Sequence, residues 1–535
     1  MARSGVRPST GAVIALVPVA FLVVFVVWPL VAVGVRSLAG VAPERVLEVA
    51  FRSTTRSVVG FTLLQAALST IVTLVVGLPV AQVLARYRFW GRRVVRVVAV
   101  VPFVMPTVVV AGAFIRVFDR VGVVEARSLV AIVAAHVFFN VAVVVRVVGG
   151  YWADTDRRLE DSARMLGAGP WAVFRWVTLP RLGPALAAAT TLVFLFSFTS
   201  FGVIRLLGGP ARATLETEIF RYAVRRIEFD VAAVLALIQL IAVAALAVIS
   251  GALQRRVAFV QQGRRRSLAR PAITWAERVH VGAALLLIAA VVVVPMAAMV
   301  EGSFAVGDGY GLDHYQRLFT RGDLLPVSAG RALLVSLGFA ALAAAMAVVV
   351  GVAAAVTVVR GGRVGRTLEA LTLVPLGVSA VTLGFGYLLA FSLFELRRSI
   401  WVVPLAHAVI GLPFVLAAVV PTMRSLDPRL AQAAAVLGAR PRTAALTVTW
   451  PLIRPAVATG AGFAAAVSIG EFGATSFLAR GASSFTAPLA IFRLLSQPGE
   501  ALRGQALALS VVLGLLVATL TAIIEWRRAD GATLL

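Results

Sequence analysis

The feature that most constrains this chain is the repetition of apolar runs that are each long enough to cross a membrane. A membrane span needs ~20 mainly apolar residues. Twelve stretches of the 535-residue chain qualify, near residues 11–34, 57–85, 94–117, 128–148, 184–207, 230–250, 279–299, 332–359, 367–392, 400–422, 455–477 and 505–525. With 60% hydrophobic and only 14% charged residues, the chain cannot surround a core with a water-wetted surface. We therefore predict an all-α membrane protein of about 12 transmembrane helices.

The composition excludes several classes of site. The chain has no cysteine, which excludes disulfides, thiolate metal ligands and a cysteine nucleophile. It also has no lysine, so it contains no P-loop, whose lysine binds phosphate. The net charge of +26 comes from arginines in short segments between apolar runs, which is the positive-inside pattern and not a nucleic-acid-binding face. We expect no cofactor, no metal site and no nucleic-acid partner.

The arginines also predict the orientation. Four of them follow the second span and six follow the sixth, at positions 86, 88, 92, 93 and 255, 256, 264, 265, 266, 270. Because even-numbered connections carry the excess, both termini are expected in the cytoplasm. The first span is too long for the apolar region of a signal peptide, so we expect it to be retained.

The second half of the sequence repeats the first. A shift of 271 positions places Leu166 and Gly167 on Leu437 and Gly438, and Pro180 on Pro451. The same shift carries Ala135-His136 onto Ala406-His407 and Phe201-Gly202 onto Phe472-Gly473. Since each half has six spans, an even number, the halves have the same orientation and form a parallel repeat. The predicted domains are residues 1–251 and 279–535, joined by an arginine-rich cytoplasmic linker at 252–278.

A polar stretch with glycine and proline at the same spacing occurs in both halves, at 159–185 (the first loop) and 430–456 (the second loop). Leu159, Ala163 and Leu166 share one face of a short helix, Gly167 suits its C-terminal cap, and a second helical piece begins at Pro170. Such a helix pair is expected either to dock a cytosolic partner or to lie in the lipid headgroups. The repetition at identical spacing favours docking of two copies of a partner.

The first loop resembles the EAA loop of binding-protein-dependent ABC importer permeases, a glutamate-alanine-alanine pattern followed by a glycine and then by a Leu-Pro pair. The stretches AHVFFN (135–140), SFTSFGVIRLLGGPARATLETEIFR (197–221) and SIGEFGATSFL (468–478) are similar to the fused permeases for thiamine and, somewhat less, to those for ferric iron. The resemblance covers nearly the whole chain.

The resemblance implies a bacterial inner-membrane permease that is not itself an enzyme. Two copies of a separate ABC ATPase would dock on the loops, and an extracytoplasmic substrate-binding protein would deliver the cargo. By position, Glu160 would contact the ATPase through its charge, Ala163 and Leu166 would fill its cleft, and Gly167 would make the turn. The second loop departs from the pattern because Ala431 replaces the glutamate, which leaves Ala434, Leu437 and Gly438 for the fit.

Four residues are candidates for the translocation pathway: Ser200, Phe201, Glu471 and Phe472. An acid within a span is costly on insertion scales, about 2.5–3.5 kcal/mol, so Glu471 needs either a pathway or a hydrogen-bonded neighbour. His136 and His407 occupy equivalent positions, and we interpret both as structural because no further ligand stands at metal-binding spacing. The cargo is interpreted as thiamine or a phosphate ester of it, with ferric iron as the alternative. An ion-driven secondary transporter would leave the paired loops unexplained.

Overall fold

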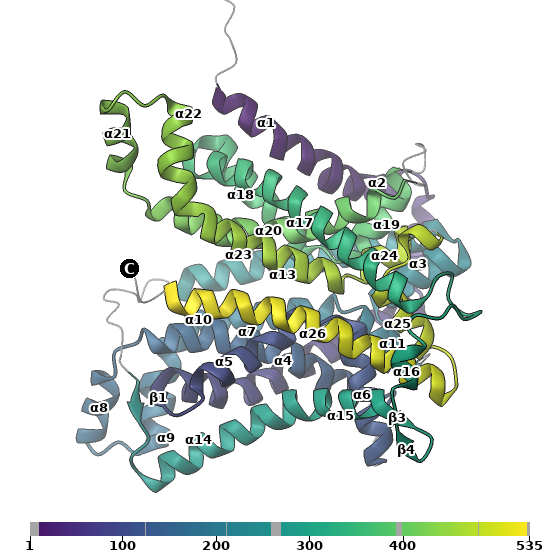
Figure 1. Cartoon of the computed structure of the whole chain (residues 1–535), viewed down its shortest axis with the longest axis horizontal. Coiled ribbons are helices and arrows are strands. Elements are labelled where there is room, and N and C mark those ends of the chain that lie inside the picture. Colours follow the sequence, from purple (N-terminus) through teal and green to yellow (C-terminus); the bar gives the residue numbers. More distant parts are fainter. Residues whose placement is uncertain are drawn as a thin grey trace, which may run out of the picture.

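The computed structural model describes residues 10–122, 125–209, 211–257, 269–391, 399–479 and 481–531. Almost all of its regular structure is helical (Figure 1). In the elements below, η marks a 3-10 or π-helical turn. The first half contains α1 (Thr10–Leu22), η1 (Val23–Val27), α2 (Trp28–Leu38), α3 (Pro43–Phe51), α4 (Ser53–Arg86), α5 (Arg92–Val100), η2 (Val101–Val104), α6 (Thr107–Val121), α7 (Leu129–Ala153), α8 (Arg158–Met165), α9 (Pro170–Val173), η3 (Phe174–Thr178), α10 (Leu179–Phe198), α11 (Gly202–Leu207), α12 (Leu215–Phe220), η4 (Arg221–Arg226) and α13 (Phe229–Val257).

The second half follows the same order. It contains α14 (Trp275–Ile288), η6 (Ala289–Val293), α15 (Val294–Phe304), α16 (Asp313–Gln316), α17 (Ala329–Arg360), α18 (Gly362–Gly377), α19 (Ala380–Ala390), α20 (Val402–Ser425), α21 (Pro428–Val436), α22 (Pro441–Ala444), η8 (Ala445–Thr449), α23 (Trp450–Gly470), α24 (Gly473–Leu478), η9 (Ala482–Ser484), α25 (Ala487–Leu495) and α26 (Glu500–Gly531). Two minimal strand pairs complete the structure: β1 (Tyr87–Arg88) runs parallel to β2 (Arg270–Pro271), and β3 (Ala305–Val306) antiparallel to β4 (Gly309–Tyr310).

The described residues include ten helices that are long and apolar enough to cross a membrane, or twelve if two bent pairs each count as one span. The spans predicted at 94–117 and 367–392 are these bent pairs, with angles of 108° and 103° between their segments. Pro106 precedes α6, and proline cannot donate the backbone hydrogen bond that would continue a helix. In the second pair the Ser379 hydroxyl caps a new helix by accepting from the Thr382 N–H at 2.9 Å. Each of these two predicted spans is therefore a bent pair of helices and not one continuous helix.

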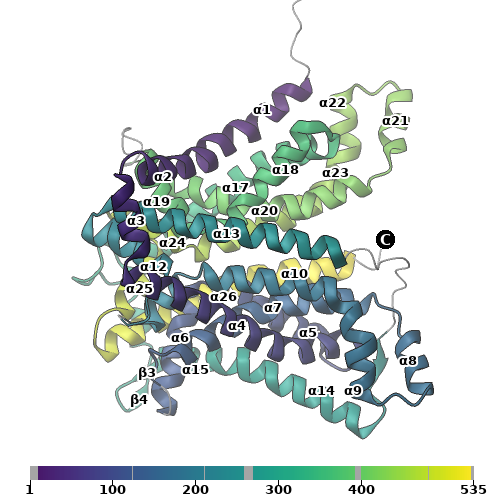
Figure 2. The same cartoon turned by 180° about the vertical axis from the view of Figure 1, so that it is seen from behind.

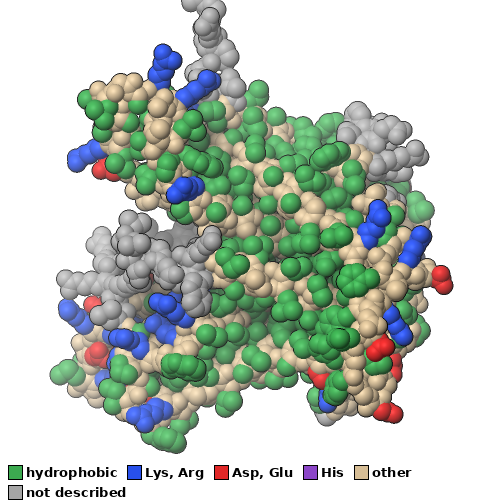
Figure 3. All heavy atoms as spheres, in the orientation of Figure 1, with side chains coloured by type: hydrophobic (Ala, Val, Ile, Leu, Met, Phe, Trp, Pro, Cys, Tyr) green, Lys and Arg blue, Asp and Glu red, His purple; other side chains and the backbone are tan. Residues whose placement is uncertain are grey.

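The 271-residue repeat is present in the structure. The short elements α9 and α22, η3 and η8, and α11 and α24 coincide residue for residue after the shift. The helix pairs α8–α9 and α21–α22 lie at the same end of the molecule (Figures 1 and 2), as a parallel repeat requires. Helix α1 starts towards this end and α26 finishes at it. Figure 3 shows the surface hollowed between the two lobes that carry these pairs.

The two sequence halves exchange their first spans. Helices α1 and α2 pack against α17 and α19 of the second half, whereas α14 and α15 pack against α4 and α6 of the first. The Tyr387 hydroxyl on α19, for example, donates to the Phe25 carbonyl at 2.6 Å. The predicted domains are thus halves of the sequence and not separate compact units. Of the predicted linker, residues 258–268 lie outside the described residues, while α13 extends to Val257 and α14 begins at Trp275.

Candidate functional site

The two loops start with the same cap. The Asp156 carboxylate accepts from the Arg158 N–H at 3.0 Å before α8, and the Asp427 carboxylate accepts from the Arg429 N–H at 2.9 Å before α21. These positions are equivalent in the repeat. An aspartate at a helix start satisfies backbone N–H groups that have no partner within the helix. The sequence therefore fixes the start of both loop helices in the same way.

Both loop helices also end in the same turn. Gly167 and Gly438 have φ of +86° and +84°, in the left-handed region that favours glycine. After each glycine the backbone bonds back to the helix: the Ala168 N–H donates to the Ala163 carbonyl at 3.0 Å, and the Ala439 N–H to the Ala434 carbonyl at 3.0 Å. This is the Schellman geometry that closes a helix C-terminus. The prediction of a C-terminal glycine cap is confirmed at Gly167.

Large apolar side chains project from the two turns. Met165 and Leu166 are 89% and 88% exposed, and their equivalents Val436 and Leu437 are each 87% exposed. Ala163 and Ala434 are half-buried at the helix bases. Four such side chains in two equivalent positions, at one end of the molecule, form matched apolar protrusions. This repeated exposure makes the two turns a candidate interaction surface.

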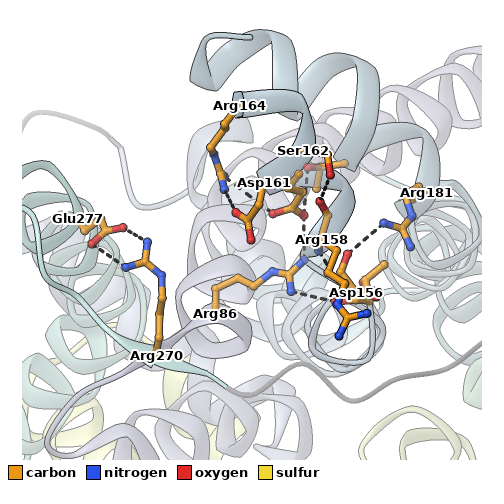
Figure 4. Close-up of polar contacts among 12 residues, drawn as sticks. Arg86, Asp156, Arg158, Asp161, Ser162, Arg164, Arg181, Arg270 and Glu277 are labelled. Atoms are coloured by element: carbon orange, nitrogen blue, oxygen red, sulfur yellow. Dashed lines mark hydrogen bonds and ion pairs between the residues drawn. The ribbon is translucent and has the colours of Figure 1, made fainter. Parts of the chain in front are cut away.

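Glu160 does not take the position expected for a contact with another protein. Its carboxylate is buried and forms an ion pair with the Arg86 guanidinium at 2.8 Å, and it also accepts from the Thr178 hydroxyl at 3.3 Å. Arg86 also donates to the Thr155 carbonyl at 3.0 Å. In Figure 4 the Arg86 side chain points towards the base of the first loop. We therefore correct the expected outward charged contact: here Glu160 ties the loop helix to the end of α4.

The second half lacks this ion pair. Ala431 stands at the position of Glu160. Helix α17 ends at Arg360 as α4 ends at Arg86, and Gly351 packs on Val415 as Gly77 packs on Val144. Because Arg360 is exposed, its charge stays in water and needs no buried carboxylate partner.

The predicted pathway residues meet at a cavity between the halves. Ser200, Phe201, Glu471 and Phe472 all line a cavity of about 300 Å³. Its wall contains six phenylalanines, at positions 103, 139, 196, 201, 414 and 472. The polar side chains in the wall are Thr107, His136, Asn140, Thr199, Ser200, Ser379 and Glu471. Among the described residues that line it, none is an arginine. The cavity is therefore mainly apolar, with six phenylalanines in its wall and one carboxyl among its polar side chains.

Phe201 and Phe472 join the halves at this cavity. Their rings stack with centroids 5.3 Å apart and planes inclined by 19°. Each ring also packs on a ring of its own half, Phe201 on Phe220 at 5.3 Å and Phe472 on Phe492 at 5.1 Å. A Cβ atom at the adjacent Gly202 would lie 2.1 Å from the Thr107 hydroxyl oxygen, so glycine permits this close approach. The stack is an apolar contact that any separation of the halves at this point has to break.

Glu471 sits in a break between α23 and α24 and not in a continuous span. Its carboxylate accepts from the N–H groups of Ala474 at 2.7 Å and Thr475 at 2.9 Å, which caps α24. His407 Nε2 lies 3.1 Å from the same carboxylate. The wall of the cavity thus contains a carboxyl whose oxygens are already bonded.

The His407–Glu471 contact is a feature of the cavity wall that the sequence did not predict, because the two residues lie far apart in the chain. His407 also bonds the Ser468 hydroxyl at 2.7 Å and the Thr475 hydroxyl at 2.8 Å. Within the part of the chain that the structure describes, no group of three or more His, Asp or Glu side chains is placed to hold a metal ion. The available signal was that both residues are polar positions inside apolar runs.

Comparison with known proteins gives a match in each half. The family model described as "Binding-protein-dependent transport system inner membrane component" matches residues 73–259 and 347–528. The chain is 24% identical over 468 residues to a probable ABC transporter permease protein of Sinorhizobium fredii, with 81% of each chain covered. It is 32% identical over 195 residues to the sulfate transport system permease protein CysT of Escherichia coli, covering 35% of this chain and 70% of that one.

A third relative is the thiamine transport system permease protein ThiP of Salmonella typhimurium. The identity is 30% over 215 residues, which cover 38% of this chain and 40% of ThiP. The relatives therefore share a permease role but differ in the cargo that their names state.

Proposed function

The chain belongs to the family of binding-protein-dependent transport system inner membrane components, and we propose that it imports thiamine. As an ABC importer permease it provides the membrane passage, while ATP is hydrolysed by a separate subunit. The proposal places the protein in a bacterial inner membrane with both termini in the cytoplasm. The loop end of the molecule, to which α1 and α26 both run, would then be the cytoplasmic end.

The docking proposal rests on the repeated loops. Two copies of the ATPase would each receive one protrusion, Met165 and Leu166 on one side and Val436 and Leu437 on the other. The Gly167 and Gly438 turns hold these side chains outward in the same geometry. Closure of the ATPase pair would then move the two lobes against each other and open or close the path between them. The substrate-binding protein would dock at the opposite end.

The cargo proposal rests on the interface cavity. Six phenylalanines and one carboxyl suit an aromatic cation, because aromatic faces attract cations and stack on rings. Sulfate is bound by charged donors or clustered N–H groups, and no arginine is among the described residues of the wall. The same reasoning favours free thiamine over its phosphate esters.

The cavity suits ferric iron less well than thiamine. A hard ion needs several oxygen ligands. The carboxyl in the wall, that of Glu471, already accepts from two backbone N–H groups. The cavity volume of about 300 Å³ is at the lower end of the range for pockets that hold small organic molecules.

The test is uptake of labelled thiamine, ferric iron and sulfate, side by side, in cells with and without the gene. We expect loss of thiamine uptake alone. Loss of iron or sulfate uptake with unchanged thiamine uptake would overturn the cargo proposal and leave the permease assignment intact.

A further inference from the structure

His136 and His407 are equivalent in the repeat but have different surroundings. Both are buried, and in each the Nδ1 atom bonds a serine hydroxyl, Ser69 at 2.9 Å and Ser468 at 2.7 Å. His407 Nε2 is satisfied by Thr475 and Glu471. In the first half these two partners are replaced by Ile204 and Ser200. Among the described residues, His136 Nε2 consequently has no hydrogen-bond partner.

The two histidines also differ in their position relative to the cavity. His136 lies in the wall of the interface cavity, whereas His407 is not among the residues that line it. Asn140 lies one helical turn further along α7, on the same face, and also lines the cavity. Its equivalent in the second half is Gly411, which has no side chain to offer. Hydrogen-bonding side chains are therefore concentrated on the first-half wall.

Leaving His136 Nε2 without a hydrogen bond in the cavity wall destabilises the protein. A buried donor or acceptor that lacks a partner has lost its hydrogen bonds to water without gaining others in the protein. An imidazole presents Nε2 as donor or acceptor according to its tautomer, and the Ser69 hydroxyl can match either choice at Nδ1. A bound molecule with a donor and an acceptor side by side would relieve the cost whichever tautomer is present.

We propose that His136 Nε2 and the Asn140 amide bind the hydrogen-bonding ring of the cargo, so that the cargo lies in a fixed orientation across the two halves. The inference rests on the proposed thiamine cargo, whose aminopyrimidine ring carries a donor amine beside acceptor nitrogens. Its cationic ring would then face the second-half wall, which contributes Phe414, Phe472 and Glu471. The first half would bind the hydrogen-bonding ring and the second would supply the carboxyl for the cation, with phenylalanines of both halves packed around the cargo.

The experiment measures thiamine uptake kinetics in cells that express the full chain with its ATPase and binding protein. His136→Phe removes the hydrogen-bonding atoms at similar size and should raise KM about three- to tenfold, with little change in the amount of protein in the membrane. His136→Gln restores an amide and should recover most of that loss. Ser69→Ala removes only the bond to Nδ1 and serves as the control for a structural role.

Each outcome decides one claim. A raised KM in His136→Phe with near-normal KM in Ser69→Ala and in His136→Gln supports the inference. Equal effects in His136→Phe and Ser69→Ala, or an unchanged KM in His136→Phe, would overturn it while the thiamine proposal stands. If the unaltered chain gives no thiamine uptake above cells that lack it, the cargo proposal fails and this inference fails with it.

Discussion

At the scale of single residues, the buried Arg86–Glu160 pair distinguishes the two halves. Only 4% of the Arg86 side chain and 9% of the Glu160 side chain are exposed. Removing one member of a buried ion pair costs about 3–5 kcal/mol, because the other charge is left without compensation. The second half avoids this cost because Ala431 replaces the glutamate and Arg360, the arginine that ends α17, is exposed.

The buried pair predicts that its two members can be removed together at lower cost than one alone. Glu160→Ala alone should destabilise the protein and lower uptake, since Arg86 then lies buried and unpaired. Adding Arg86→Thr should restore a large part of the stability, measured as the thermal unfolding midpoint in detergent. Asp161→Ala is the control, because Asp161 pairs with Arg164 at 2.6 Å on the surface, where such pairs contribute little. A double variant as unstable as the single one would contradict the account.

The residue scale also shows where sequence reasoning stops. The periodicity of the first loop located its apolar stripe but not which face would be buried: Leu159 and Leu166 are exposed, and Glu160 is buried. That choice depends on Arg86, which lies 74 positions earlier at the end of another helix. Likewise His407 and Glu471 come together because α23 ends at Gly470, and a hydropathy pattern does not report such a break.

At the scale of elements, the turns after α8 and α21 determine how the exposed leucines are presented. At Gly167 and Gly438 a Cβ would have nothing within 4 Å, so the cost of alanine there is that of the left-handed backbone alone. That cost is roughly 1–2 kcal/mol per residue.

The Gly167→Ala/Gly438→Ala variant should therefore reshape both turns and weaken association with the ATPase, while the spans remain folded. The measurement is the amount of ATPase that copurifies with the chain. Gly169→Ala is the matched control, because Gly169 has a φ of −66° that alanine adopts readily. Equal copurification by the double variant and the control would show that the turns do not present the docking side chains.

The sequence predicted where the membrane-spanning helices lie, but it did not show which of them are bent. Ten of the twelve predicted spans correspond to long single helices or to helices with a short break, because apolar length is a strong signal. The two bent spans contain Pro106 and Pro375, and a proline can bend or end a helix. Whether a proline does so depends on packing, which the sequence does not show. The exchange of first spans between halves likewise depends on long-range packing.

At the scale of the whole molecule, the departures from two-fold symmetry fall at opposite ends. The first half has its buried ion pair at the loop end, between α4 and α8. The second half has its buried His–Glu contact at the far end of α23, roughly 30 Å along that helix from the second loop. The cavity lies between the halves near this far end. A movement of the lobes would thus act on two halves that are stabilised by different buried polar contacts at different ends.

The most direct test of the account is the number of ATPase subunits that one chain binds. Native mass spectrometry of the complex purified with its ATPase should give two copies per chain. Leu166→Asp and Leu437→Asp, each placed in one protrusion, should each reduce this to one copy, and the two changes together should abolish binding. Two copies retained in the double variant, or a single copy on the unaltered chain, would contradict docking through the two repeated loops.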